Sequence, residues 1–166
     1  MRVHVLDRRM RRCRAVREHR RMTRLHADDA RHLPITTEEQ IERRIGDLLQ
    51  GALRRQWWTL YLDDDDVQSP LIMPMAEYPD DPFAPCGDEG TAAELLAKRV
   101  AHIAAEVDAA KVVFVWERPG AAESTEADRA WARALGSACR AEGLAVRAQL
   151  ILHDGGPRWF APDDYV

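Results

Sequence analysis

Apolar residues recur at helical spacing in three segments of the chain, and two of these segments begin with a capping signal. The first segment follows Thr37, whose spacing to Gln40 is typical of a capping box, and extends to about Arg55. The second follows Thr91, which has the same relation to Glu94. The pattern therefore predicts two helices with these starts. Their apolar positions are Ile41, Ile45, Leu48, Leu49, Ala52 and Leu53 in the first helix, and Leu96, Val100, Ile103 and Val107 in the second.

A third helix is predicted over residues 126–142, opening at Thr125. Two acidic residues, Glu126 and Asp128, fall in its first turn, where carboxylates interact favourably with the helix dipole. Gly143 follows the last turn and supplies the left-handed conformation that ends many helices. The apolar positions of this helix are Trp131, Leu135, Ala138 and, beside them as a small core residue, Cys139.

Two strand-like segments lie between the first two helices. Residues 56–62 and 69–75 are rich in aromatic and branched side chains, and an acidic run at 63–66 separates them, so we expect a β-hairpin. Pro70 and Pro74 confine the second strand to an edge of the sheet or to strand ends, because proline has no N–H to donate to a ladder.

The later strands complete a recognisable order of elements. Residues 112–116 are a continuous apolar run, typical of a strand buried on both faces, while 145–152 alternate and 158–160 form a short return strand. The Pro-, Gly- and acid-rich loop at 76–90 is long for a connection, which is typical of a functional or mobile segment. The order α-β-β-α-β-α-β-β predicts a single α/β (mixed α+β) domain, with a mixed β-sheet flanked by about three helices.

Residues 1–33 differ from the rest of the chain in charge. The first 32 residues carry eleven arginines and four acidic residues, a net charge of +7; the whole chain is at −4, which leaves −11 for the remainder. We therefore expect a basic N-terminal extension at 1–33 and a domain at 34–166. Several interpretations of the extension stay open: a disordered or nucleic-acid-binding arm, a short polar helix on the domain, or upstream sequence ahead of a true start at Met22.

The composition, with 46% apolar and 31% charged residues, is typical of a soluble globular protein. No apolar run approaches the roughly 18 residues that cross a bilayer, and the N-terminus lacks the apolar core of a secretory signal. Three cysteines without CxxC pairing fit a reducing compartment. We expect a cytoplasmic protein without membrane association. Its 22 arginines among 24 basic residues are typical of a GC-rich bacterial genome.

Several short motifs follow one another in a defined order along the second half of the chain. The strand VVFVW ends close to Pro119-Gly120, Thr125 and Asp128 begin a helix as T-x-x-D, and Gly143 precedes the hairpin QLILHDGGPRWF. From about Leu49 to Tyr165 this series resembles the RadC-like branch of the JAB/MPN metallopeptidase-type fold. The signature of that family is a strand ending in His-x-His-Pro-Ser-Gly, then a Ser-x-x-Asp that starts a helix. The resemblance implies a JAB/MPN-like domain.

In that family two histidines and the aspartate hold a zinc ion, and a glutamate on an upstream strand acts as general base. Aligning on the proline places Trp116 and Arg118 at the two histidine positions, where neither an indole nor a protonated guanidinium can bind zinc. The strand around Ser69 offers no carboxylate for the base, and only Asp128 keeps its ligand type. We therefore predict a degenerate member with no metal site, no cofactor and no catalytic residue of the family's kind.

The remaining candidates each have two interpretations. Asp128 is either a first-turn carboxylate or a remnant ligand, and Trp116 either fills the strand end or stacks on a partner. Arg118 forms either a solvated pair with Glu117 or a pair with Asp128 that closes the former pocket or binds an anion. His153 lies in a turn and, with Asp128, is a weak catalytic candidate.

Two function classes stay open. The first is a non-catalytic domain that acts by binding a protein partner or a second copy of itself, with Trp116, Arg118 and Asp128 as binding candidates. The second is a hydrolase or nucleic-acid-associated protein with an atypical site around Asp128, Arg118 and His153. The charge of −11 outside the extension opposes contact with phosphates, so we expect nucleic acid to bind only through the basic extension.

Overall fold

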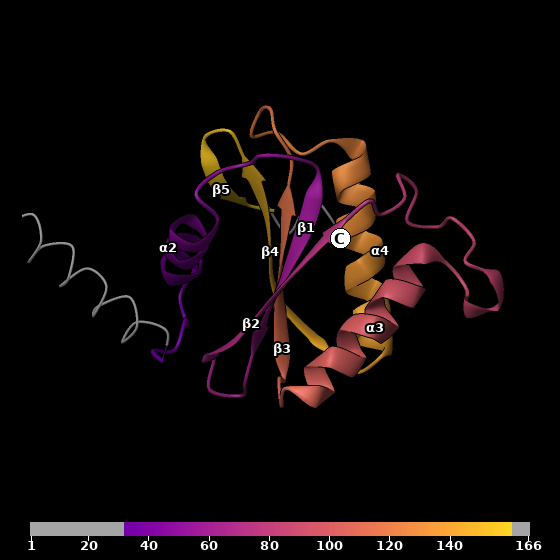
Figure 1. Ribbon diagram of the computed structural model, residues 1–166, viewed down its shortest axis with the longest axis horizontal. Coiled ribbons are helices and arrows are strands. Elements are labelled where there is room, and N and C mark those ends of the chain that lie inside the picture. The colour runs from indigo at the N-terminus through magenta and orange to yellow at the C-terminus, as the bar shows by residue number, and fades with distance from the viewer. Residues whose placement is uncertain (1–31, 161–166) are drawn as a thin grey trace, which may run out of the picture. The chain divides into compact units, whose positions relative to one another are not determined.

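The computed structural model describes residues 32–160, which contain three α-helices and five strands of one α/β domain (Figure 1). The succession α-β-β-α-β-α-β-β is confirmed, and strand ends differ from the predicted ones by one or two residues. The predictions for the extension at 1–33 fall, apart from its last two residues, outside the described residues. The elements are α2 (Glu38–Leu49), β1 (Gln56–Leu62), β2 (Gln68–Ala76), a 3-10 turn (Gly87–Glu89), α3 (Ala92–Glu106), β3 (Lys111–Glu117), α4 (Glu126–Ala141), β4 (Ala145–His153) and β5 (Gly156–Trp159).

The five strands form one mixed sheet in the order β2-β1-β3-β4-β5. Strands β3 and β4 are parallel and are joined by α4, while all other neighbours are antiparallel. The predicted β1–β2 hairpin is confirmed, with Trp57 opposite Met75 and Trp58 opposite Pro74. Strand β2 lies at the edge of the sheet, as its two prolines predict.

Helices cover both faces of the sheet, with α3 and α4 on one side and α2 on the other (Figure 1). Because side chains alternate along a strand, β3 contributes side chains to the hydrophobic cores on both faces of the sheet. Phe114 and Trp116 join the α3–α4 core, whereas Val113 and Val115 join the core beneath Ile41 and Ile45 of α2. Residues 112–117 of β3 are all buried, which confirms the prediction of burial on both faces.

Helix boundaries follow local hydrogen bonds. The capping boxes predicted at Thr37 and Thr91 are both present. A third one joins Thr125 to Asp128 at the start of α4. At the other end of α4, Gly143 has a φ of 76° and donates to Arg140 O, and the next N–H bonds to Cys139 O, as in a Schellman motif.

The prediction that the first helix extends to about Arg55 is wrong. Helix α2 ends at Leu49 because Gln50 (φ 53°) and Gly51 (φ 129°) turn the chain out of the helical conformation. Leu53, predicted on the apolar face, is 87% exposed. Its N–H bonds to a side chain of β3 instead of a helical carbonyl.

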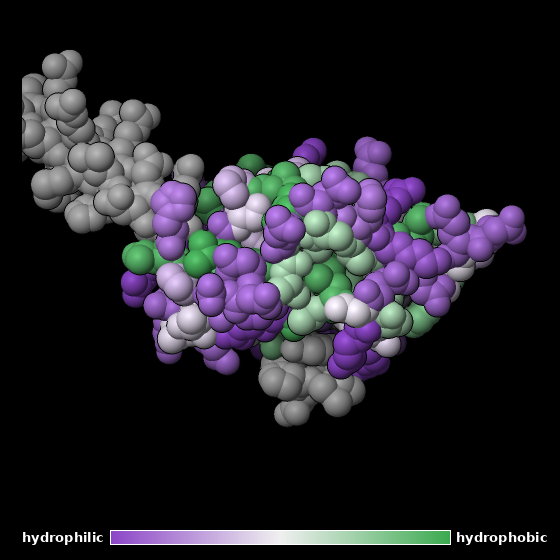
Figure 2. Space-filling view, turned by 90° about the horizontal axis from the view of Figure 1, so that it is seen from below, coloured by the Kyte–Doolittle hydropathy of each residue, from purple (hydrophilic) through white to green (hydrophobic). Residues whose placement is uncertain are grey.

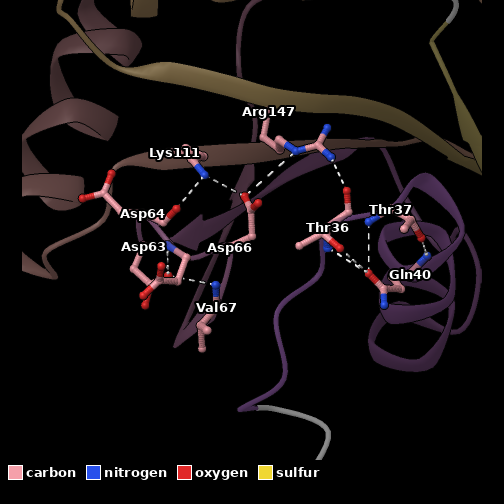
Figure 3. Close-up of polar contacts among 10 residues, drawn as sticks. Thr36, Thr37, Gln40, Asp63, Asp64, Asp66, Val67, Lys111 and Arg147 are labelled. Carbon is pink, nitrogen blue, oxygen red and sulfur yellow. Dashed lines mark hydrogen bonds and ion pairs between the residues drawn. The ribbon is translucent and has the colours of Figure 1, made fainter.

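The acidic run between β1 and β2 folds into a turn that joins four parts of the domain (Figure 3). Asp63 Oδ1 accepts hydrogen bonds from the N–H groups of residues 65 and 67 within the turn. Asp66 pairs with Lys111 Nζ at 2.9 Å and lies 4.0 Å from Arg147 Nε, and Arg147 donates in turn to Thr36 O at 2.7 Å. The run therefore connects the hairpin to β3, β4 and the start of α2.

Figure 2 shows the face at the bottom of Figure 1, where hydrophobic and hydrophilic residues are interspersed. Within residues 32–160, no helix combines the length and the apolar character that crossing a membrane requires.

Candidate functional site

The predicted site residues come from one edge of the sheet. The parallel strands β3 and β4 both end there, and α4 begins beside them, at the top of Figure 1. This is the position at which open α/β sheets commonly place their binding sites. Trp116 and Arg118 lie at the end of β3, Asp128 in the first turn of α4, and His153 at the end of β4.

Arg118 and Asp128 are in direct contact. Arg118 Nε donates to Asp128 Oδ2 at 2.8 Å, and the two side chains are only 18% and 15% exposed. The same Oδ2 accepts the N–H of Thr125 at 2.8 Å, so the carboxylate serves the helix cap and the ion pair together. The interpretation of Arg118 as a solvated partner of Glu117 is wrong. Arg118 pairs with Asp128, whereas the side chain of Glu117 lies on the α2 face of the sheet and accepts a hydrogen bond from Trp58 there.

All three nitrogens of the Arg118 guanidinium donate to acceptors within the protein. Its other two nitrogens donate to the carbonyl oxygens of Ala121, at 3.1 Å, and Glu123. Arg129 and Arg158 donate to the carbonyls of Ser124 and residue 122 in the same loop, at 2.7 and 2.8 Å. Arg118 thus holds the loop at 121–123 and the start of α4 together, and three of its five N–H groups are used in doing so.

Trp116 is 2% exposed and fills the end of the strand. Its Nε1 donates to Gln149 Oε1 at 3.0 Å, and Gln149 donates to Ala132 O at 2.8 Å, so its polar atom is satisfied inside the protein. The ring packs against Trp57, Trp131 and Tyr78 with centroid distances of 5.1 to 6.1 Å. In this structure the indole is out of reach of a partner.

Tyr78, from the loop after β2, covers this aromatic cluster. Arg55 stacks on its ring at 3.9 Å, and Trp131 Nε1 donates to Pro79 O at 3.0 Å. Burial is the main cause that raises the pKa of Tyr78 to about 12, so its phenol stays protonated at neutral pH. The first part of the loop at 76–90 is therefore packed onto the domain.

His153 belongs to the turn between β4 and β5. Its Nδ1 accepts the N–H of Gly155 at 3.0 Å, and a Cβ at position 155 would lie 2.9 Å from its ring. Within residues 32–160 it makes no hydrogen bond or ion pair with Arg118 or Asp128. The structure thus brings Arg118 and Asp128 together but does not add His153 to them.

The residue that the sequence analysis missed is Glu117, which is 2% exposed. Its Oε1 accepts the N–H groups of Leu53 at 2.6 Å and Arg54 at 3.2 Å. Its Oε2 accepts Gln56 Nε2 and Trp58 Nε1, both at 2.6 Å. Burial by itself raises the pKa of this carboxyl, but the four hydrogen bonds, led by that from Leu53, outweigh it and lower the pKa.

One signal in the sequence points to this placement. If the strand continues by one residue beyond Trp116, strand alternation puts position 117 on the same face as Val113 and Val115, which are core residues. The donors could not be inferred, since two of them are backbone N–H groups of a loop 63 and 64 residues away.

The chemistry available at this edge is limited. Both carboxylates, Glu117 and Asp128, are occupied by protein donors. Cys139 lies away from this edge, in the last turn of α4, where it is fully buried and burial raises its pKa to about 12. Over residues 32–160, no group of three His, Cys, Asp or Glu side chains is placed to hold a metal ion. Comparison with protein-family models yields no match to this chain, and comparison with curated proteins yields none either.

Proposed function

We propose that this chain is a non-catalytic, RadC/JAB-like domain that acts by binding another protein. The observation that carries the proposal is the Arg118–Asp128 pair, which occupies the edge where the resemblance to the family implies a zinc site. A guanidinium beside the aspartate supplies a fixed positive charge in the place of a cation, and it cannot act as a metal ligand.

The state of the neighbouring groups supports a structural role for this edge. General acid–base catalysis needs a group that can exchange a proton with a substrate within hydrogen-bond reach. Glu117 is enclosed by four donors, and Asp128 is shared between a helix cap and Arg118. A hydrolase built on Asp128, Arg118 and His153 would have to break these contacts first.

The resemblance also implies how such a domain works, because inactive domains of the MPN type commonly pair with another protein. Apolar side chains remain on the surface of this domain, among them Leu53 at 87% and Phe83 at 62% exposure. Met73 and Met75 on the edge strand are only partly buried. Exposed apolar groups of this kind contribute to protein–protein contacts.

The first test is the zinc content of the purified, tag-free protein after incubation with zinc and dialysis, measured by elemental mass spectrometry. We expect far less than one zinc per chain. Near-stoichiometric zinc that is lost in Asp128→Asn would show a working metal site and would overturn the proposal. Sedimentation velocity of the same sample then shows whether the partner is a second copy of the chain.

A further inference from the structure

A groove lies between the first half of α3, the second half of α4 and the loop that precedes α3. Its volume is about 500 Å³, and none of the residues that line it belongs to the Arg118–Asp128 site. Its lining includes Phe83 from the loop, Glu89 and Glu94 around the start of α3, and Ala138 and Glu142 from α4. We call it the α3–α4 groove.

The floor of the α3–α4 groove is made of small side chains. Ala134, Ser137, Ala138 and Ala141 of α4 have short side chains, and Ala93 of α3 is buried beneath them, so the backbone of another element can approach closely. Phe83 lies at the border of the groove with 62% of its surface exposed, although burying a phenyl ring away from water is favourable. The groove therefore combines a shallow apolar floor with one exposed aromatic anchor.

The rim of the groove is acidic. Asp88, Glu89, Glu94 and Glu142 line it with a single cation, Lys98, which leaves a net charge of −3. Lys98 Nζ is directed to Glu89 O at 3.4 Å, so its charge lies near the start of α3. The loop between β2 and α3 projects at the right of Figure 1, and the same side of Figure 2 is mostly hydrophilic. Charge complementarity calls for a basic occupant.

The elements around the groove also restrict the shape of the occupant. An extended strand binds by adding to the edge of a sheet, but two helices and a loop present no ladder of free N–H and C=O groups. A helix, in contrast, satisfies its own backbone and packs side chains into a groove between two other helices.

We propose that the α3–α4 groove binds a basic amphipathic helix of a protein partner. The apolar stripe of that helix would rest on the alanine floor and Phe83, while its Lys and Arg side chains face Asp88, Glu89 and Glu142. This inference rests on the proposed function, since it names the chemistry of the protein that the domain binds.

The test uses the full chain and two synthetic peptides of identical Leu, Ala and Lys content. In one peptide the leucines recur at i, i+3, i+4 and i+7, and in the other the same residues are scrambled. We expect the amphipathic peptide to bind about tenfold more tightly by fluorescence anisotropy, because only it presents an apolar stripe. Its chemical-shift changes in ¹⁵N-labelled protein should lie at residues 83–98 and 134–142.

Two matched variants separate the groove from general charge attraction. Asp88→Lys with Glu89→Lys should weaken binding by about tenfold or more, whereas Asp64→Lys with Asp65→Lys, the same change at the exposed hairpin turn, should leave it nearly unchanged. Phe83→Ser should weaken binding without changing the net charge. Circular dichroism confirms that each variant is folded.

Equal binding of the two peptides, or equal weakening in both double variants, would overturn the inference, because it would show charge attraction alone. Shift changes on another surface would also overturn the groove while leaving a protein-binding function intact. Stoichiometric zinc in the separate assay would instead remove the proposed function, so the two failures are distinguishable.

Discussion

Glu117 shows at the residue scale how an ionised group can be held in a protein interior by neutral donors. Four hydrogen bonds surround its carboxylate, from two loop N–H groups, Gln56 and Trp58. Within the described residues, no Lys, Arg or His side chain forms an ion pair with it. Because hydrogen bonds to a charged group are stronger than those between neutral groups, the carboxylate fixes the connection from α2 to β1.

We expect Glu117→Gln to lower the free energy of unfolding by about 2–3 kcal/mol, since the amide NH₂ would face donors that now have no acceptor. Glu123→Gln, the same change at an exposed position, should cost less than about 0.5 kcal/mol. Urea unfolding of both variants measures the difference. Equal stability of the two variants would show that the carboxylate does not hold the loop.

The same carboxylate should make stability depend on pH in one direction. Its folded-state pKa lies below the ordinary value of 4.5, so the unfolded chain takes up the proton first as the pH falls. Its contribution is complete above pH 4.5 and is lost as the pH falls through the folded-state pKa. Urea unfolding of the wild type and Glu117→Gln from pH 7 to pH 3 should therefore show their difference narrowing below pH 4.5.

Tyr61 is a buried polar residue whose replacement, unlike that of Glu117, should not destabilise the protein. It is fully buried, its hydroxyl has no hydrogen-bond partner in the described structure, and burial raises its pKa to about 12. Because an unpaired buried hydroxyl is costly, Tyr61→Phe should leave the free energy of unfolding unchanged or raise it by up to about 1 kcal/mol. A loss of more than about 1 kcal/mol in thermal unfolding would reveal a partner for the hydroxyl, such as a buried water.

At the scale of elements, the start of α4 is held to the end of β3 by Asp128. Its Oδ2 accepts from both Thr125 N–H and Arg118 Nε, so Asp128→Ala should cost about 2–3 kcal/mol, more than the loss of a cap alone. Glu126→Ala, in the same turn but exposed, should cost no more than about 1 kcal/mol.

A double-mutant cycle with Arg118→Ala should give a coupling energy of about 1–2 kcal/mol, measured by chemical unfolding of the four proteins. If Asp128→Ala costs only about 1 kcal/mol and the coupling is zero, Asp128 is a simple helix cap and the ion pair adds nothing.

Strand β2 is an edge strand whose prolines limit what can pair with it. Pro70 and Pro74 are exposed and carry no N–H, so a second strand meets an incomplete ladder. We expect the double change Pro70→Thr with Pro74→Thr to increase self-association in sedimentation velocity. Pro119→Thr, at an exposed turn, is the control. An unchanged sedimentation coefficient in the double variant would show that other features protect the edge.

At the scale of the whole molecule, charge is separated along the chain. Residues 1–21 carry nine arginines and two acidic residues, a net charge of +7, which leaves −11 on residues 22–166. Since DNA affinity depends on basic groups that neutralise phosphates, a chain that begins at Met22 should not shift duplex DNA in a retardation assay. Any DNA binding of the full chain should fall steeply with salt, and salt-insensitive binding by both chains would contradict this prediction.

The helices and strands of the domain were within reach of the sequence because their signals are local. Capping boxes at Thr37 and Thr91, the apolar run 112–116 and the two prolines of β2 act over a few residues, and each was confirmed. The end of α2 was not, because the left-handed turn at Gln50 precedes a loop whose N–H groups bond to distant Glu117.

What the sequence determined by itself was therefore the order of the elements, the mixed sheet with three helices, and the presence at positions 116 and 118 of Trp and Arg, neither of which can bind zinc. Only the tertiary structure decided which polar groups meet. Glu117 and Arg118 are adjacent in the chain, but strand alternation sends the first into the α2 face and the second to Asp128. Such pairings depend on how strands and helices pack, because the partners lie far apart in sequence and no local pattern records them.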